Sequence, residues 1–376
     1  MDADPSRAAM GPAISRAVHT TRAVLGGALD WDGADALDPS AMAVTALGMG
    51  IPILIGVLSA HPRVGLAASL GAMWVGNAPR GANLAEHWRT VRDIVLAAIG
   101  AAIAAALIAR HGWGSDVALV LVAGTAALLG GFSRPAAAAS QRFIVFVTIG
   151  FGVAMHASDR ILLTILIAEG AIWAALCALA VGAAARRWRI GQIVPPEPRS
   201  SASFAQLYRR WRRLMATIGG WIYSLRLMAC LACAVVIREA VPQHHYSWIA
   251  VAVALLTQRQ SDGLVVKVLQ RAMGVAAGVM ATEAIASRPL PAWTLVVVIA
   301  SLAAASPWLR KRSYVAYTAT TTPLILLLTS GGGTIGQGLL IDRLVATLIA
   351  AGLVIAAFLA ARRFMPRPSP DSPRPG

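Results

Sequence analysis

Charged side chains inside or beside apolar stretches are the residues of this sequence with the clearest potential for chemistry. Arg271 lies roughly two turns into an apolar run at residues 264–286, and Arg89 and Arg92 precede another run at 93–109. A guanidinium group is planar, permanently charged and able to donate two hydrogen bonds to one carboxylate, so these arginines are candidate binders of a carboxylate anion. For Arg271 two interpretations are open: the side chain reaches the lipid headgroups, or it faces an aqueous path and meets an anion.

One acidic side chain, Glu169, lies about ten residues into the apolar run at 161–185, close to the middle of a predicted membrane span. An isolated carboxylate at that depth is costly and usually faces a cavity or a partner. Glu169 therefore has either a functional role, in proton uptake or in a salt bridge that lines a path, or a structural pairing.

An Asp-Arg pair stands at the outer start of the last apolar run in each half of the chain. The pairs are Asp159-Arg160 and Asp342-Arg343. Ion pairs at a membrane interface commonly anchor helix ends, and the alternative is that the two pairs are related gates.

Aromatic, histidine and hydroxyl side chains are further candidates to contact a solute. His245, Tyr246 and Trp248 cluster at one end of the run at 247–258, and Thr321 lies in a hydroxyl-rich, proline-containing part of the run at 314–330. The aromatic rings can stack on a cyclic substrate or form the belt that Trp and Tyr favour at membrane interfaces. The hydroxyls indicate a kinked helix that lines a path or hydrogen bonds between helices. The same aromatic argument applies to Trp74, Tyr314 and Tyr317.

The sequence contains no group of residues spaced like an enzyme active site or a metal centre. Motifs typical of zinc proteases, serine hydrolases and phosphate-binding loops are missing from it. His244 and His245 have no third ligand at suitable spacing, and Cys230 and Cys233 lie in an apolar run without polar neighbours. We therefore predict a protein that is not an enzyme and holds no metal or cofactor.

The elements that position these residues are predicted to be membrane helices. The chain is 57% hydrophobic and 13% charged, about half the charged fraction of a typical soluble domain. Its net charge of +16 does not indicate nucleic-acid binding, because the basic residues fall between apolar runs rather than along one polar face. The fold class is therefore all-α, a polytopic protein whose first partner is the lipid bilayer.

About twelve apolar runs divide the chain into two groups of six. The first group occupies residues 41–185, with runs at 43–60, 64–77, 93–109, 116–131, 143–157 and 161–185. The second occupies 224–363, with runs at 224–241, 247–258, 264–286, 292–309, 314–330 and 340–361. Residues 1–40 form an amphipathic cytoplasmic N-terminus, 186–223 a basic linker with an interfacial or partner-docking helix, and 364–376 a disordered tail.

The two groups carry a repeated pattern. Asp159-Arg160 followed by Thr164 and Ala168 is matched by Asp342-Arg343 followed by Thr347 and Ala351, and Gly81 and Arg89 correspond at nearly the same offset to Gly263 and Arg271. Six spans in each repeat make the repeats parallel, with a transport pathway expected at their interface. Most of the 33 Lys and Arg residues fall in alternate connections, which places both termini in the cytoplasm.

The stretch from His244 to Ala281 resembles the fusaric acid resistance-like (FUSC) family. The resembling features are His245-Tyr246-Ser247-Trp248, an apolar run, a polar turn with Gly263, and Gln270-Arg271 followed by Gly274 and Gly278. The two glycines have the spacing that lets membrane helices approach closely. The resemblance is best over the C-terminal third and extends to the first half through the internal repeat.

The family includes bacterial aromatic acid exporters and is related to plant aluminium-activated malate transporters. The resemblance therefore implies a transporter in the bacterial inner membrane that exports small organic anions, particularly aromatic carboxylates, with proton coupling through Glu169 as a further hypothesis. It also implies two candidate partners, a periplasmic adaptor protein and a second copy of the chain. Two alternatives stay open: a passive organic-anion channel and a membrane scaffold that transports nothing.

Overall fold

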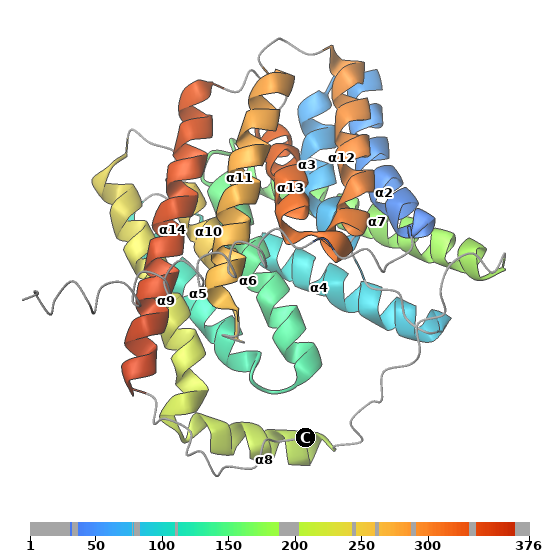
Figure 1. Ribbon diagram of the computed structural model, residues 1–376. Helices are drawn as coiled ribbons and strands as arrows, with labels where there is room; N and C mark the ends of the chain where they lie inside the picture. The colour runs from blue at the N-terminus through green and yellow to red at the C-terminus, as the bar shows by residue number, and fades with distance from the viewer. Residues whose placement is uncertain are drawn as a thin grey trace, which may run out of the picture.

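The structure is a computed structural model of the 376-residue chain. It describes residue 31 and residues 37–76, 78, 83–109, 112–187, 203–242, 246–259, 263–286, 291–330 and 336–364. Within these ranges every regular element is an α-helix, which confirms the predicted all-α class (Figure 1). The amphipathic segment expected before residue 31, the turn containing His245 and the tail beyond Phe364 lie outside the described residues.

Each of the twelve predicted apolar runs corresponds to one helix. The first helix group consists of α2 (Pro39–Leu58), α3 (Pro62–Val75), α4 (Leu84–Ile108), α5 (Trp113–Leu129), α6 (Arg134–Ala154) and α7 (Arg160–Arg187). The second helix group consists of α9 (Ile218–Ala240), α10 (Ser247–Leu256), α11 (Leu264–Ala286), α12 (Ala292–Arg312), α13 (Tyr314–Thr329) and α14 (Gln337–Phe364). Between them lies the short amphipathic helix α8 (Phe204–Met215).

Eight of the described helices are long and apolar enough to cross a membrane: α2, α4, α6, α7, α9, α11, α12 and α14. Helices α5, α10 and α13 are apolar but have only 10–17 residues, and α3 has 14. A full span needs roughly 20 residues, so these four helices are short for a complete span, and each lies between two long helices along the chain. The chain is therefore a multi-pass membrane protein.

Helices α4 and α6 begin nine residues before their apolar runs, the largest offset among the helices, because a capping residue rather than hydropathy fixes the start of a helix. Helix α4 begins at Leu84, where the Asn83 side chain accepts a hydrogen bond from the Glu86 backbone N–H at 2.8 Å. Helix α6 begins at Arg134, where the Ser133 hydroxyl accepts from the Ala136 N–H at 3.2 Å. Both helices begin with a stretch that contains charged or polar residues, and the apolar run starts only further along.

The pattern of helix pairing is largely the same in both groups, although α4 packs on α5 and the corresponding helices α11 and α12 do not pack to the same extent. In the first group α2 packs on α3 and α7, α3 on α7, α4 on α6 and α7, and α5 on α6. In the second group α9 packs on α10 and α14, α10 on α14, α11 on α13 and α14, and α12 on α13. The contacts between the groups also correspond in pairs. The first helix of each group packs on the fourth helix of the other, α2 on α12 and α9 on α5, and the second packs on the fifth, α3 on α13 and α10 on α6.

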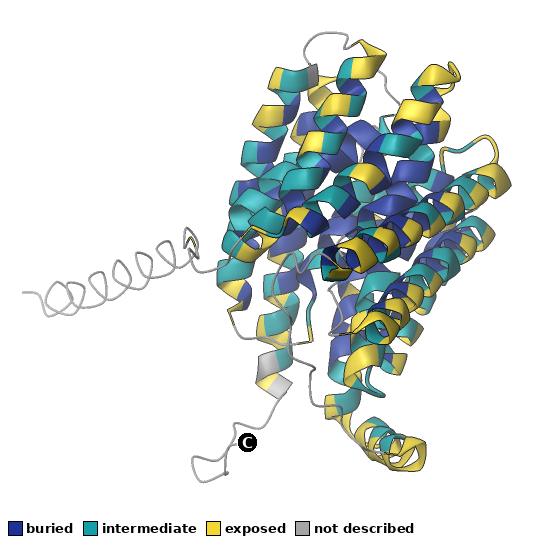
Figure 2. Ribbon diagram, turned by 90° about the vertical axis from the view of Figure 1, so that its right-hand side faces the viewer, coloured by how far each residue is buried: buried dark blue, intermediate teal, exposed yellow. Residues whose placement is uncertain are grey.

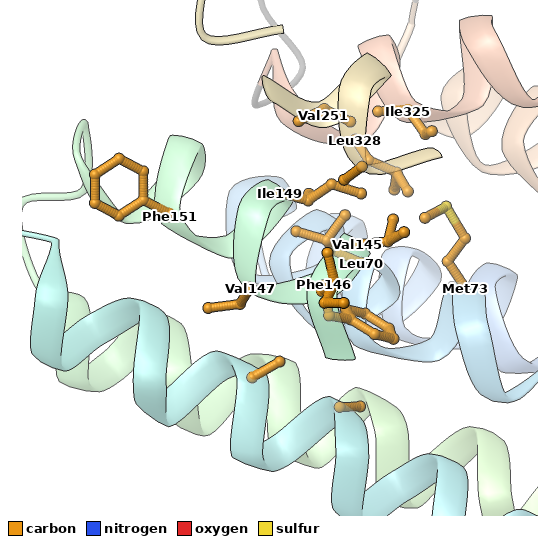
Figure 3. Packing of buried hydrophobic residues seen from close by; sticks show 14 of the residues in the cluster. Leu70, Met73, Val145, Phe146, Val147, Ile149, Phe151, Val251, Ile325 and Leu328 are labelled. Carbon is orange, nitrogen blue, oxygen red and sulfur yellow. The ribbon is translucent and has the colours of Figure 1, made fainter. Parts of the chain in front are cut away.

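The seam between the two groups is filled by apolar side chains. Figure 3 shows Leu70 of α3 and Val145 and Ile149 of α6 close to Val251 of α10 and Leu328 of α13. All five are buried. The interface at which the sequence predicts a pathway is therefore closed in this conformation. Figure 2 shows buried positions concentrated at the centre of the bundle, whereas α8 lies at its edge and has no buried residue.

Candidate functional site

Helices α11 and α13 approach each other closely at the two glycines that the sequence singles out. A Cβ atom at Gly274 would lie 2.6 Å from the Cβ of Thr318 and 2.6 Å from the carbonyl oxygen of Val315. At Gly278 it would lie 2.6 Å from the Cβ of Thr322. The predicted close approach is confirmed, and the matching order of the contacts makes the two helices parallel.

This close packing positions Arg271 one turn before Gly274, inside the bundle. Only 6% of Arg271 is exposed, and its Nε has no hydrogen-bond partner among the described residues. Its charge also acts on Tyr317 of the neighbouring α13. Arg271 is therefore buried between helices, and that it faces an aqueous path and meets an anion stays a prediction.

A second buried arginine, Arg343, comes from α14. Its exposure is 1%, and within the described part of the chain neither Nε nor Nη1 has a hydrogen-bond partner. Its Cζ lies 3.9 Å from the ring centroid of Trp248 at the start of α10, a cation–π contact. The charges of Arg343 and Arg271 act on each other.

We call these residues the arginine pair site: Arg271, Arg343, Trp248 and Tyr317. Among the residues that the structure describes, neither arginine forms an ion pair with an acidic side chain. Two neighbouring cations withdrawn from water repel each other, and an unpaired buried charge costs several kcal/mol. N–H donors without a partner, two positive charges and the aromatic ring of Trp248 together suit the binding of an anion with an apolar or aromatic body.

Three of the predicted residues of the first helix group lie on the outside. Arg89 and Arg92 are exposed on α4, and Arg92 pairs with the adjacent Asp93 at 2.8 Å. Glu169 is exposed on α7. The arginine pair site therefore has no equivalent at Arg89, although the sequence aligns Arg89 with Arg271.

The two Asp-Arg pairs occupy different environments. Asp159 is exposed and accepts hydrogen bonds from the backbone N–H groups of Ile161 and Leu162 at 2.9 and 3.0 Å, which stabilises the start of α7. Arg160 donates to the carbonyl of Ala109. Asp342 and Arg343 are both buried, with exposures of 6% and 1%.

Thr321 and Tyr246 lie near the site without joining it. The Thr321 hydroxyl donates to the Tyr317 carbonyl of its own helix at 2.9 Å, as threonines in membrane helices commonly do. Tyr246 lines a cavity of about 10 Å³ between α5, α6, α9 and α10, large enough for about one water molecule.

The same cavity borders a buried ion pair that the sequence did not single out. Arg238 of α9 donates to Asp116 of α5 at 2.6 Å. It also donates to the next residue in the chain, the exposed Glu239, at 2.7 Å. Asp116 is 2% exposed, so this pair joins the two helix groups inside the structure. Both residues stand at the ends of apolar runs, where charges are common, and nothing in their spacing indicates that they meet.

A polar cluster joins the two groups at the opposite ends of these helices. The Tyr223 hydroxyl of α9 donates to the Gln141 side chain of α6 at 2.7 Å, and Gln141 donates to the Ala254 carbonyl of α10 at 2.9 Å. Arg259 covers the Tyr223 ring at 4.7 Å and donates to the Ala127 carbonyl at the end of α5. A cation at the C-terminal end of a helix is favourable, because the last carbonyls carry partial negative charge.

These helices define the class: a multi-pass α-helical membrane protein. Residues 231–357 match the model of the family described as fusaric acid resistance protein-like. The match confirms the resemblance found around His244–Ala281, and its range includes Trp248, Arg271 and Arg343. No curated protein and no solved structure matches the chain.

Proposed function

We propose that this protein transports small organic anions, particularly aromatic carboxylates, and exports them from the cytoplasm. The observation that carries the proposal is the pair of buried guanidinium groups of Arg271 and Arg343, which have no acidic partner among the described residues. The matched family supports the transporter class. The resemblance to aromatic acid exporters supports the substrate and the direction.

A carboxylate at the arginine pair site removes two costs at once. It accepts hydrogen bonds from guanidinium donors that have no partner, and its negative charge offsets the repulsion between Arg271 and Arg343. Trp248 supplies aromatic surface beside the charge of Arg343, and Tyr317 lies on α13, which packs on the helix that carries Arg271. A neutral solute gains none of the electrostatic benefit, so the site selects for anions.

We further infer that the chain is built from two parallel six-helix repeats, α2–α7 and α9–α14, with α8 as the connection. The matched helix pairings and the repeated Asp-Arg pattern support this architecture. Each contact between the groups has a counterpart with the partners exchanged, as a two-fold axis along the membrane normal requires. This assignment makes all twelve helices part of the membrane domain, with the short ones packed between long ones.

Two contacts between the groups are suitable gates. The Asp116–Arg238 ion pair closes one end of the α5–α9 contact, and the Tyr223–Gln141 hydrogen bond joins α9 to α6 at the other. With the positive-inside distribution of Lys and Arg, the first is the extracytoplasmic gate and the second the cytoplasmic gate. Opening one while the other stays closed gives alternating access to the anion.

The same charge distribution supports placement in a bacterial inner membrane with both termini in the cytoplasm. An exporter in that membrane releases its substrate into the periplasm. A periplasmic adaptor protein is accordingly a proposed partner.

Transport of a radiolabelled aromatic carboxylate, 4-hydroxybenzoate, into proteoliposomes tests the proposal. The wild type, Arg343→Ala and Arg271→Ala are compared with Arg363→Ala, which removes an exposed arginine from the end of the same helix as Arg343. We expect both site variants to lose at least ten-fold in initial rate and the control to match the wild type. Equal rates in all four proteins would refute the site.

The same vesicles separate a carrier from a channel. A carrier saturates with substrate and exchanges internal for external anion, whereas a channel follows the membrane voltage and shows no such exchange. A protein that folds, inserts and moves no anion under either condition is a scaffold, which overturns the proposed function.

A further inference from the structure

One face of α7 carries a line of exposed side chains with the spacing of a helix–helix contact. Leu162, Ile165, Ile172 and Leu176 are 48%, 48%, 48% and 56% exposed. With Glu169 they follow steps of three, four, three and four residues, the seam of a left-handed helix pair. The only charged member stands at the centre of the line.

Glu169 lies deep in the membrane part of α7. It is about 14 Å along the axis from Arg160, at about 1.5 Å per residue, in a helix of 28 residues that qualifies as a membrane span. A glutamate side chain is much shorter than this distance and does not reach the headgroups. Among the described residues it has no hydrogen-bond or ion-pair partner, and the side chains around it on this face are aliphatic.

Rotation of α7 does not bring Glu169 into the bundle, because the opposite face is locked against α3. Gly170 packs directly on the carbonyl of Ala68, and Gly71 packs on the carbonyl of Ile167. Trp173 adds a hydrogen bond from its Nε1 to the Leu47 carbonyl of α2 at 3.2 Å. The carboxyl group is therefore held outward at a depth where lipid offers no donor.

We infer that this face of α7 is the contact between two copies of this chain, and that the two Glu169 side chains meet there. A two-fold axis along the membrane normal places α7 beside α7 of the second copy in parallel, so that each residue of the seam faces its own counterpart. The aliphatic residues then pack on themselves. At this depth both carboxyl groups are protonated, each donates its O–H to the carbonyl oxygen of the other, and the pair carries no net charge.

This arrangement accounts for the position of the acid as well as the exposed apolar line. A polar residue at one seam position fixes the register and the number of strands in a helix contact. A different protein could cover the same face only if it supplied a hydrogen-bond donor for Glu169. A second copy of the chain supplies that donor with its own Glu169, at the same position of an identical helix. The contact is independent of the arginine pair site, which lies in the second helix group.

Disulfide cross-linking in native membranes tests the contact without changing any charge. In a chain whose three cysteines, Cys177, Cys230 and Cys233, are replaced by alanine, single cysteines are placed at Ile165, at Ile172 and, as the control, at Leu348. Leu348 is 53% exposed on α14. We expect oxidation to give a product of twice 39.1 kDa at the α7 positions only. Equal cross-linking at Leu348, or a product of another mass, overturns the inference.

Substitution of Glu169 tests the carboxyl pair. Glu169→Gln keeps a hydrogen-bonding side chain and should retain the dimer, whereas Glu169→Lys places two cations together and should reduce the dimer fraction at least ten-fold. Leu348→Lys introduces the same charge into an exposed membrane face of α14 and should leave the dimer intact. Subunit counting by fluorescence in dilute liposomes gives the fractions, and a dimer that survives Glu169→Lys refutes the pairing.

Discussion

Removal of either partner from the ion pair between α5 and α9 should have unequal effects on stability, because the two side chains differ in burial. Asp116 has 3% of its side chain exposed, whereas Arg238 has 18% and keeps a second acidic contact, Glu239, at 2.7 Å. Arg238→Ala leaves a carboxylate enclosed by protein without its cation. Asp116→Ala leaves a cation that still has Glu239 and partial access to water.

The magnitudes follow from these environments. Breaking a buried pair and leaving one charge uncompensated costs about 3–5 kcal/mol, which is the expected loss for Arg238→Ala. For Asp116→Ala the remaining pair and the partial exposure of Arg238 reduce the loss to about 1–2 kcal/mol. Glu239→Ala removes a partner that is 38% exposed and should cost less than about 1 kcal/mol.

Reversible unfolding in mixed micelles, with helix content as the signal, gives the free energy of unfolding for each variant. The expected order of destabilisation is Arg238→Ala, then Asp116→Ala, then Glu239→Ala. In the double variant Asp116→Ala/Arg238→Ala no buried charge remains, so it should be more stable than Arg238→Ala alone. A loss for Asp116→Ala equal to or greater than that for Arg238→Ala would refute the reasoning.

Three further outcomes are expected. Gly274→Leu should destabilise the protein by about 2 kcal/mol or more, since Thr318 and the Val315 carbonyl occupy the space its side chain needs; Gly352→Leu, with nothing within 4 Å of its Cβ position, is the control in the same unfolding assay. Trp248→Leu should weaken anion binding by about two-fold to thirty-fold, because it removes a cation–π contact worth about 0.5–2 kcal/mol and leaves both arginines in place; calorimetric titration with 4-hydroxybenzoate measures this. Tyr223→Phe should cost about 1 kcal/mol of stability, because it removes the 2.7 Å hydrogen bond between the helix groups, and unchanged stability would contradict its proposed role at that contact.

The sequence predicts the helices well because hydropathy along the chain is a local property. All twelve apolar runs coincide with helices, and the larger differences in boundary occur where Asn83 and Ser133 begin a helix ahead of its apolar part. The close approach of α11 to another helix is equally local in origin. Two glycines one turn apart leave a flat surface, whatever helix eventually covers it.

Only the tertiary structure decides which charged residues are brought together. Arg89 and Arg271 occupy corresponding places in the sequence, yet Arg89 is exposed and Arg271 is buried. Arg343, the other buried arginine of the site, belongs to an Asp-Arg pair that the sequence suggests as a possible gate. The partner of Asp116 is Arg238, from the other helix group and far along the chain. Such pairings depend on how the two groups pack on each other, and spacing within one segment carries no information about that.

Glu169 illustrates the same division. Its depth in the membrane can be read from its place in an apolar run, since the rise per residue of a helix is fixed. Its direction is set by the contacts of Gly170 and Gly71 with the backbone of the neighbouring helix, which only the packed structure reveals. Local hydropathy and helix geometry thus determine what enters the membrane and how far, while the packing between helices determines which way each charge faces and what it meets.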